Sequence, residues 1–134
     1  MESGIINLLI ANDHTILGKG LGYAIQSKAP DKFSIKYTED YNSTLDYLNE
    51  NIIDIVIIDF QVPNGSVFDT ITSIRNNWPE TKIILNGMFD KSSKKYFHTL
   101  HNQIDGLLSF TCNENDYIRA IEVIMKGGLF FYIP

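Results

Sequence analysis

The sequence predicts a single α/β domain, built as a doubly wound parallel sheet in which five strands alternate with five helices. Aliphatic stretches without polar alternation occur at 5–11, 55–59 and 82–85, which is typical of strands buried on both faces of a parallel sheet. Stretches with apolar residues at helical spacing separate them. Right-handed crossovers between such strands place helices on both faces of the sheet.

The size and composition favour an ordinary globular domain. With 134 residues, 44% hydrophobic and 20% charged, the chain is long enough for a real core and too apolar to be disordered. The net charge of -5 argues against binding of nucleic acid or membrane surfaces by this domain itself, and no apolar run approaches membrane-spanning length. The single Cys112 allows no intramolecular disulfide, which fits a cytoplasmic location.

The first half of the chain predicts strands over 5–11 and 33–37 and helices over 15–28 and from about 42–44 onward. Asp13 stands where it would cap the first helix. The stretch 33–37 alternates apolar and polar residues, which predicts a half-exposed edge strand. Asn42, Ser43 and Thr44 are residues that cap the second helix well.

The second half predicts strands over 55–59, 82–85 and 104–110, and helices over 67–77, 90–102 and from Asn113–Asp116 to Met125. Trp78-Pro79 ends the first of these helices, because the residue before proline disfavours helical geometry. Gly127-Gly128 ends the last one. The apolar tail 129–134 is expected to pack back on the domain or to mark the start of a linker.

The expected strand order places two carboxylates together. A flavodoxin-like order 2-1-3-4-5 suits an edge-like second strand and buried first and third strands. The carboxyl ends of strands one and three then bring Asn12, Asp13 and Asp59 to one crevice. Two carboxylates there repel each other unless a hard cation lies between them, and Mg²⁺ is commonly held by one or two carboxylates with waters. The strand alone leaves open whether Asp59 is a reactive group or simply caps a turn.

Four stretches of the sequence carry a resemblance: 8–14 (LLIANDH), 54–59 followed by Val62-Pro63, 78–84 (WPETKII) and 105–108 (DGLL). They resemble the receiver domain of bacterial two-component response regulators, over essentially the whole chain. Asp13-His14 and the ending 127–134 are most similar to the NarL/FixJ subfamily, in which this ending leads into a helix-turn-helix DNA-binding domain. The resemblance implies a receiver domain over 1–134, with any such output domain absent from this chain.

The resemblance also implies roles for individual residues. In the family, the aspartate at the position of Asp59 accepts phosphate from a histidine kinase or phosphotransfer protein. Asp13, Asp59 and the backbone carbonyl of Gln61 match the residues that hold Mg²⁺. The implied function is signal transduction that regulates an output, expected to be transcription, with self-catalysed phosphotransfer and dephosphorylation at Asp59 as the only catalysis. A homodimer is a possible partner arrangement, DNA would be reached only through an output domain, and no membrane is implied.

Among the positions that depart from the family pattern, three belong to the site itself. Asn12 replaces the first acidic residue after strand one, so it is expected to be a weak metal ligand in a weakened site. Asn86 stands where the family has the Ser or Thr that begins the conformational switch. Phe110 stands where the family has a lysine that contacts the phosphoryl group. The expected result is a receiver with degenerate switch residues.

Two alternatives stay open. The first is a phosphorylation-independent receiver fold that acts as an interaction or dimerisation module and is held in one state by Asn86 and Phe110. The second is a haloacid-dehalogenase-type phosphatase, which also uses an aspartate at a strand end. That chemistry needs a second aspartate two residues later, where this chain has Gln61, so the phosphatase is disfavoured.

Overall fold

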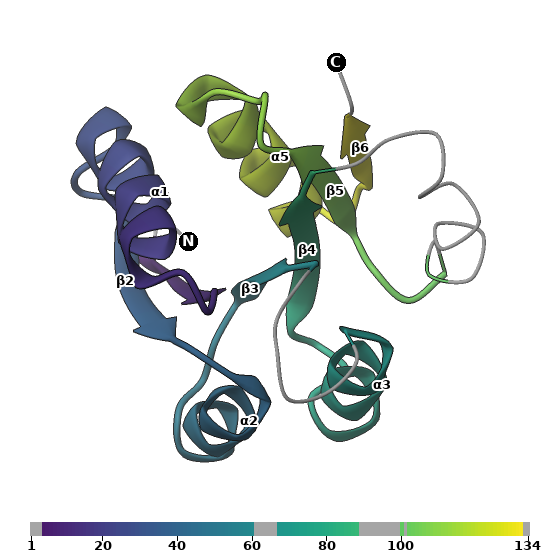
Figure 1. The fold of residues 1–134 in the computed structure, drawn as a ribbon. Coiled ribbons are helices and arrows are strands. Elements are labelled where there is room, and N and C mark those ends of the chain that lie inside the picture. The colour runs from purple at the N-terminus through teal and green to yellow at the C-terminus, as the bar shows by residue number, and fades with distance from the viewer. Residues whose placement is uncertain (1–3, 61–66, 89–99, 101, 133–134) are drawn as a thin grey trace.

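The computed structural model describes residues 4–60, 67–88, 100 and 102–132. They form a sheet of six strands in the order β2-β1-β3-β4-β5-β6, with every neighbouring pair parallel (Figure 1). The strands are β1 (Ile6–Ala11), β2 (Phe33–Thr38), β3 (Ile55–Asp59), β4 (Lys82–Gly87), β5 (Gly106–Ser109) and β6 (Phe130–Tyr132). The helices within the described part are α1 (Thr15–Lys28), α2 (Tyr41–Glu50), α3 (Val67–Asn77) and α5 (Glu114–Met125).

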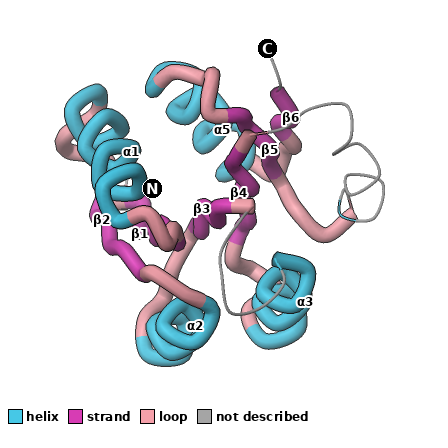
Figure 2. The backbone as a smooth tube through the Cα atoms, viewed as in Figure 1, coloured by secondary structure: helices cyan, strands magenta, loops and turns pink. Residues whose placement is uncertain are grey.

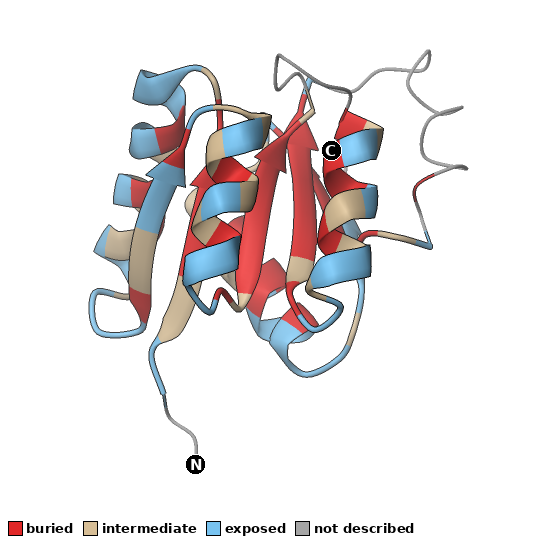
Figure 3. Ribbon diagram, turned by 90° about the horizontal axis from the view of Figure 1, so that it is seen from below, coloured by how far each residue is buried: buried red, intermediate tan, exposed pale blue. Residues whose placement is uncertain are grey.

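The sheet lies between two helical layers. Helices α1 and α5 cover one face, and α2 and α3 cover the other (Figure 1). All five residues of β3 are buried, as expected of a strand covered on both sides, and the red strands in Figure 3 show that the neighbouring strands share this burial. Because side chains alternate along a strand, the four inner strands β1, β3, β4 and β5 each contribute to both halves of the core. On the α1 and α5 side these residues include Ile10, Ile57, Ile84 and Leu108.

The predicted fold class and strand order are confirmed, with one strand more than expected. The edge position of β2 and the burial of β1 and β3 follow the predicted pattern. Strand β5 is shorter than the expected 104–110. The helix expected over 90–102 lies outside the described residues except for Leu100 and Asn102.

The additional strand is formed by the apolar tail. Residues Phe130–Tyr132 pair in parallel with β5 and form the edge of the sheet opposite β2 (Figure 2). The first backbone bond to this segment runs from the Phe130 N–H to the Asp105 carbonyl, at 3.0 Å. A Cβ on Gly106 would lie 2.8 Å from Ile124 Cδ1 and 3.3 Å from the Phe130 carbonyl oxygen, so a larger residue there would require neighbouring atoms of α5 and β6 to shift.

Two of the predicted helix caps are wrong. The N-cap of α1 is His14, with no side-chain cap, because the chain turns one residue later than expected and leaves Asp13 outside the helix. Helix α2 begins earlier than expected, at Tyr41, and Asp40 is its N-cap. The Asp40 carboxylate accepts the Ser43 N–H at 2.8 Å, and the Ser43 hydroxyl accepts the Asp40 N–H, so the serine completes a capping box.

The ends of α5 agree with the sequence. Asn113 is its N-cap and forms a capping box with Asp116. At the other end Gly127 has φ of 94°, a left-handed conformation that favours glycine. The Gly127 N–H donates to the Ile124 carbonyl and the Gly128 N–H to the Val123 carbonyl, which is the Schellman arrangement.

A partly buried ion pair joins α3 to the start of β5. The Arg75 guanidinium donates to the Asp105 carboxylate and to the backbone carbonyls of Gln103 and Thr81. The same carboxylate oxygen also accepts the Ile83 N–H, at 2.9 Å. One arginine and one aspartate therefore hold three chain segments together at the amino-terminal edge of the sheet.

Candidate functional site

Polar side chains are buried where four neighbouring strands end. These are Asn12 directly after β1, Asp59 at the end of β3, Asn86 one residue before the end of β4, and Ser109 at the end of β5. Each of them is at most 4% exposed. The register sets Asp59 directly beside Asn86, and Ala11 beside Ile58, so Asn12 follows next to Asp59. Of these four, Asn12, Asp59 and Asn86 are residues that the sequence predicts for the site, and the register places them next to one another.

Alternation along the strands places Asn12, Asp59 and Asn86 on one face. Ile57 and Ile84 belong to the core layer under α1 and α5, and so does Ile10. The residue two positions after each of them is polar. Asp59 comes two residues after Ile57, Asn86 two after Ile84, and Asn12 two after Ile10. Since residues two apart share a face of a strand, the three polar side chains point to the side covered by α1 and α5.

Asn12 and Asp13 have different surroundings. The Asn12 Oδ1 accepts the His14 N–H at 2.7 Å, so this amide shapes the turn into α1. The Asp13 Oδ1 is buried and has no hydrogen-bond partner. A buried carboxylate oxygen without a donor is costly, and a bound cation or water removes that cost.

The donor set of this site fits a hard divalent cation. Asp59 closes β3 and Asp13 follows the adjacent β1 by two residues, so both lie at the same edge of the sheet, and Mg²⁺ takes oxygen ligands while keeping several waters. Over the described ranges, no group of three or more His, Cys, Asp and Glu side chains could hold a metal. Gln61, whose carbonyl is the third expected ligand, lies outside the described residues.

Asn86 contacts a residue that sequence reasoning missed. Its Nδ2 donates to the Tyr117 hydroxyl at 3.3 Å, and its Oδ1 is buried without a partner. Tyr117 belongs to the inward stripe of α5, together with Ala120, Ile121 and Ile124. The available signal was that a tyrosine within an otherwise aliphatic stripe needs a partner for its hydroxyl.

The Tyr117 hydroxyl is buried and lies near groups that carry negative charge. Burial, above all, raises its pKa to about 12; the hydrogen bond with Asn86 opposes this, while the charges of Cys112, Asp59 and Asp116 add to it. The contribution from Asp59 shows that the phenol lies within electrostatic reach of the buried carboxylate.

We expect Tyr117 to make the protein less stable at alkaline pH. Its folded pKa of about 12 exceeds the ordinary 10.0, so its contribution is complete below pH 10 and is lost as the pH rises through about 12. A difference of about two units corresponds to roughly 2–3 kcal/mol of unfolding free energy. Urea unfolding at pH values between these limits should show the wild type losing this amount relative to Tyr117→Phe. Parallel curves for the two proteins would contradict the expectation.

Phe110 lies at the end of β5 and is 39% exposed. Its N–H donates to the Gly87 carbonyl at 3.0 Å, which continues the pairing of β4 and β5 beyond the strands. Its ring offers no hydrogen-bond donor at the position where the resemblance implies a lysine. The loss of a hydrogen bond to a charged group there costs roughly 1.5–3 kcal/mol.

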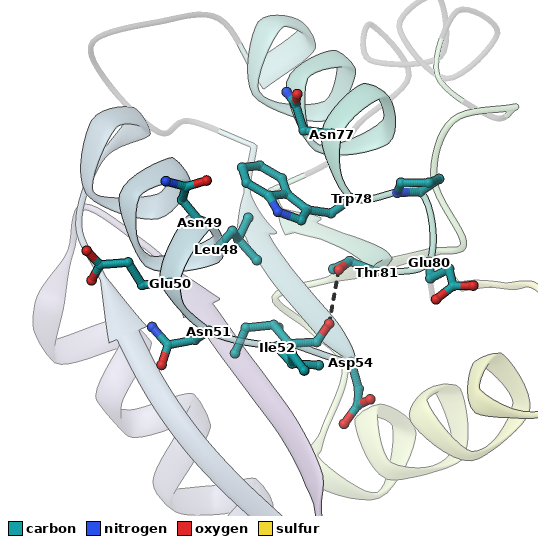
Figure 4. Close-up of a pocket in the computed structure, with 12 residues that line it drawn as sticks. Leu48, Asn49, Glu50, Asn51, Ile52, Asp54, Asn77, Trp78, Glu80 and Thr81 are labelled. Atoms are coloured by element: carbon teal, nitrogen blue, oxygen red, sulfur yellow. Dashed lines mark hydrogen bonds between the residues drawn. The ribbon is translucent and has the colours of Figure 1, made fainter.

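A hollow in the described part of the chain lies away from this site. It has a volume of about 610 Å³ and is lined by the ends of α2 and α3 and the segments that lead into β3 and β4 (Figure 4). Two of its lining residues are joined by a hydrogen bond, in which the Thr81 hydroxyl donates to the Ile53 carbonyl at 3.0 Å (Figure 4). Because Thr81 and Asp54 precede their strands, this hollow opens at the amino-terminal edge of the sheet, opposite the carboxylates.

No helix in the described part of the chain combines the length and the apolar character that crossing a bilayer requires.

Comparison with known proteins gives concordant results. The family model for the response regulator receiver domain matches residues 8–122. The chain is 24% identical to the Fimbriae Z protein of Escherichia coli K12 over 128 residues, and 25% identical to the oxygen regulatory protein NreC of Staphylococcus haemolyticus over 123 residues. These alignments cover 93% and 91% of this chain, but only 59% and 56% of the relatives, so the chain spans little more than half of their length.

A solved structure supports the same fold. The Salmonella typhimurium RcsB response regulator superposes with a TM-score of 0.83 at 21% sequence identity, covering 96% of this chain and 62% of that one. Receiver domains are signalling modules of two-component systems rather than classical enzymes. With a family model that spans most of its length and a fold that superposes closely, the chain belongs to the response regulator receiver domain family.

Proposed function

We propose that this receiver accepts a phosphoryl group on Asp59 and thereby regulates an output, expected to be transcription. The observation that carries the proposal is a buried aspartate at the end of the central strand, next to β1, after which Asp13 has a buried carboxylate oxygen without a partner. This is the arrangement that a cation-assisted phosphoacceptor site needs.

The transfer step follows from the chemistry of the donor. A carboxylate oxygen of Asp59 attacks the phosphorus of a phosphohistidine on a histidine kinase or phosphotransfer protein. An O–P bond forms as the N–P bond breaks, and the released imidazole nitrogen takes up a proton from solvent. Receiver domains generally bind Mg²⁺ at this site; when bound by Asp13, Asp59 and the Gln61 carbonyl, with Asn12 as a weak fourth group, it would neutralise charge on the phosphoryl oxygens.

The switch residues of this receiver are degenerate. Asn86 presents an amide where the family presents a hydroxyl, and Phe110 brings no positive charge. Phosphorylation is therefore expected to be slow or weakly coupled to the output, since the phosphoryl group would receive fewer charged contacts.

The test of this proposal is the intact mass after incubation with acetyl phosphate and Mg²⁺. We expect a phosphoryl adduct on the wild type that is absent from Asp59→Asn. Asp46→Asn, which removes the same charge from an exposed position of α2, should keep the adduct. An adduct that persists in Asp59→Asn would refute the assigned acceptor.

A second candidate function is favoured by Asn86 and Phe110. With neither the usual hydroxyl nor the lysine, the domain would act as a phosphorylation-independent interaction or dimerisation module. Absence of an adduct on the wild type, together with absence of Mg²⁺ binding by calorimetric titration, would select this candidate.

We propose that the protein acts in the cytoplasm and that one of its assemblies is a homodimer. Exposed apolar side chains on β6, at the edge of the sheet, support an association surface; these are Phe131 and Tyr132. The net charge of -5 does not favour nucleic-acid binding by this domain, so we assign any contact with DNA to a further domain of the kind present in longer regulators. Sedimentation of the wild type with and without acetyl phosphate would test the dimer.

A further inference from the structure

The hollow at the amino-terminal edge of the sheet continues along the ends of two helices. Its volume of about 610 Å³ adjoins a second hollow of about 370 Å³, and the two share Asn49, Asn77 and Trp78 as lining residues. Figure 4 shows the Trp78 side chain between the ends of α2 and α3. We call the two hollows together the amino-terminal groove. It is far larger than a single ion and has the size of sites that take several side chains.

Acidic side chains line the amino-terminal groove. Glu50, Asp54 and Glu80 line the larger hollow and Asp46 lines the smaller one, while no lysine, arginine or histidine is among the described lining residues of either. Asp54 is held in place, because its carboxylate accepts the Asn7 N–H at 2.8 Å. The other three are exposed, and none of them forms an ion pair with a described residue. The groove therefore carries negative charge that the described part of the chain does not neutralise.

Two helix ends add to this negative potential. Helices α2 and α3 end at the groove, at Glu50 and Asn77, because each of them leads into a parallel strand that starts at this edge. The last carbonyls of a helix carry a partial negative charge, which basic residues in the last turn commonly offset. The last turn of α2 has no basic residue, and Arg75 of α3 is already paired with Asp105. Both helix ends therefore favour a cation in the groove.

The acidic residues of α2 oppose the stability of their own helix. Asp46 and Glu50 are four residues apart, so they are neighbours on the helix surface, and like charges at this spacing are unfavourable. Glu50 is also the last residue of α2, where the helix dipole disfavours a negative charge. Natural proteins break such local rules mainly at functional sites. A cation that binds from outside would relieve both costs.

The shape of the groove indicates the kind of cation. A metal ion needs several ligands around one point, and over the described ranges no three acidic, histidine or cysteine side chains are placed to hold one. The carboxylates are instead spread around the half-buried indole of Trp78 (Figure 4). A guanidinium group is a planar cation that stacks on an indole and donates several hydrogen bonds to carboxylates and carbonyls. Arginine side chains therefore match the ring, the charges and the helix ends together.

We propose that the amino-terminal groove docks a basic, arginine-containing segment of a partner protein. Guanidinium groups of that segment stack on Trp78, pair with Glu50 and Glu80, and donate to the last carbonyls of α2 and α3. The groove lies at the edge of the sheet opposite Asp59, so a partner bound there leaves the proposed phosphoacceptor uncovered. The inference therefore stands or falls independently of the function proposed above.

The fluorescence of Trp78 reports on the groove directly, because the chain has no other tryptophan. The experiment titrates the wild type with the peptide acetyl-Gly-Arg-Gly-Arg-Gly-Arg-amide at physiological ionic strength. The matched probe replaces each arginine by lysine, which keeps the charge and removes the planar group. We expect a saturable change with the arginine peptide and about tenfold weaker binding of the lysine peptide, since an ammonium group stacks less well on an indole.

Two variants test the carboxylates of the groove. The groove variant combines Glu50→Gln with Glu80→Gln, and the control variant combines Asp31→Asn with Glu122→Gln, which removes the same charge from exposed positions outside the groove. We expect the groove variant to bind the arginine peptide about tenfold more weakly, and the control variant to bind it like the wild type. All four exchanges keep the size of an exposed side chain, and far-ultraviolet circular dichroism checks that both variants fold.

Several results would overturn the proposal. Absence of a saturable change with either peptide would show that the groove takes no basic segment. Equal weakening in the groove variant and the control variant would show attraction to the net charge of the whole domain. Equal binding of the arginine and lysine peptides would refute the stacking on Trp78. The same fluorescence change with Mg²⁺ or Ca²⁺ alone would assign the groove to a metal ion.

Discussion

Asp105→Ala is expected to lower the free energy of unfolding by about 3 kcal/mol, because it leaves a partly buried guanidinium without its counter-charge. The side chains of Arg75 and Asp105 are only 23% and 14% exposed. The substitution also removes the acceptor of the Ile83 N–H at the start of β4. Urea denaturation followed by circular dichroism measures this loss directly.

A second ion pair, which is exposed to solvent, serves as a control that has the same charges but much less burial. Lys32 and Glu122 approach to 3.6 Å, with side chains that are 59% and 52% exposed. Glu122→Ala should change the free energy of unfolding by less than about 1 kcal/mol, since solvent screens an exposed pair. The loss of unfolding free energy caused by Asp105→Asn should lie between the losses caused by Asp105→Ala and Glu122→Ala, because the new amide oxygen still accepts the Ile83 N–H. Equal losses for Asp105→Ala and Glu122→Ala would contradict the assigned role of the network.

Asp13→Asn is expected to slow Mg²⁺-dependent phosphorylation of Asp59 by about 100-fold, which corresponds to roughly 2.7 kcal/mol of transition-state stabilisation. Asn12 already lacks a charge, so this substitution removes one of the two carboxylates proposed to hold the cation. The measurement is the rate of adduct formation by intact mass over a series of Mg²⁺ concentrations. The Mg²⁺ concentration for half-maximal rate should rise together with the loss of rate.

The control for this prediction is Asp31→Asn, which removes one negative charge from an exposed loop. It should leave both the rate and its Mg²⁺ dependence unchanged. If Asp13→Asn behaved in the same way, Asp13 would have no part in cation binding, and its unpartnered oxygen would need another explanation.

Part of the candidate site was predictable because parallel strands end at one edge of a sheet. Asp59 and Asn86 each close a continuous aliphatic stretch, and Asn12 follows one, so their meeting follows from the strand order alone. Tyr117 was not predictable in the same way. It lies 31 residues beyond Asn86, and only the packing of α5 against the sheet brings its hydroxyl to the amide.

The helix caps also divide into one that the sequence predicts and one that depends on the tertiary structure. The sequence predicted the Asn113 cap correctly but assigned the α1 cap to Asp13, because both residues are good caps in isolation. Which of them caps a helix depends on where the backbone turns. Asn12 binds the His14 N–H and sets that turn, which leaves the Asp13 oxygen unpartnered.

By itself, the sequence determined the α/β class, the order of the first five strands and the edge at which Asn12, Asp59 and Asn86 meet, because burial patterns and crossover handedness act through short-range rules. Only the tertiary structure decided that the tail becomes β6, that Arg75 joins Asp105, and that Tyr117 faces Asn86. These contacts join segments far apart in the chain. Their geometry depends on how whole elements pack, which no local pattern of residues encodes.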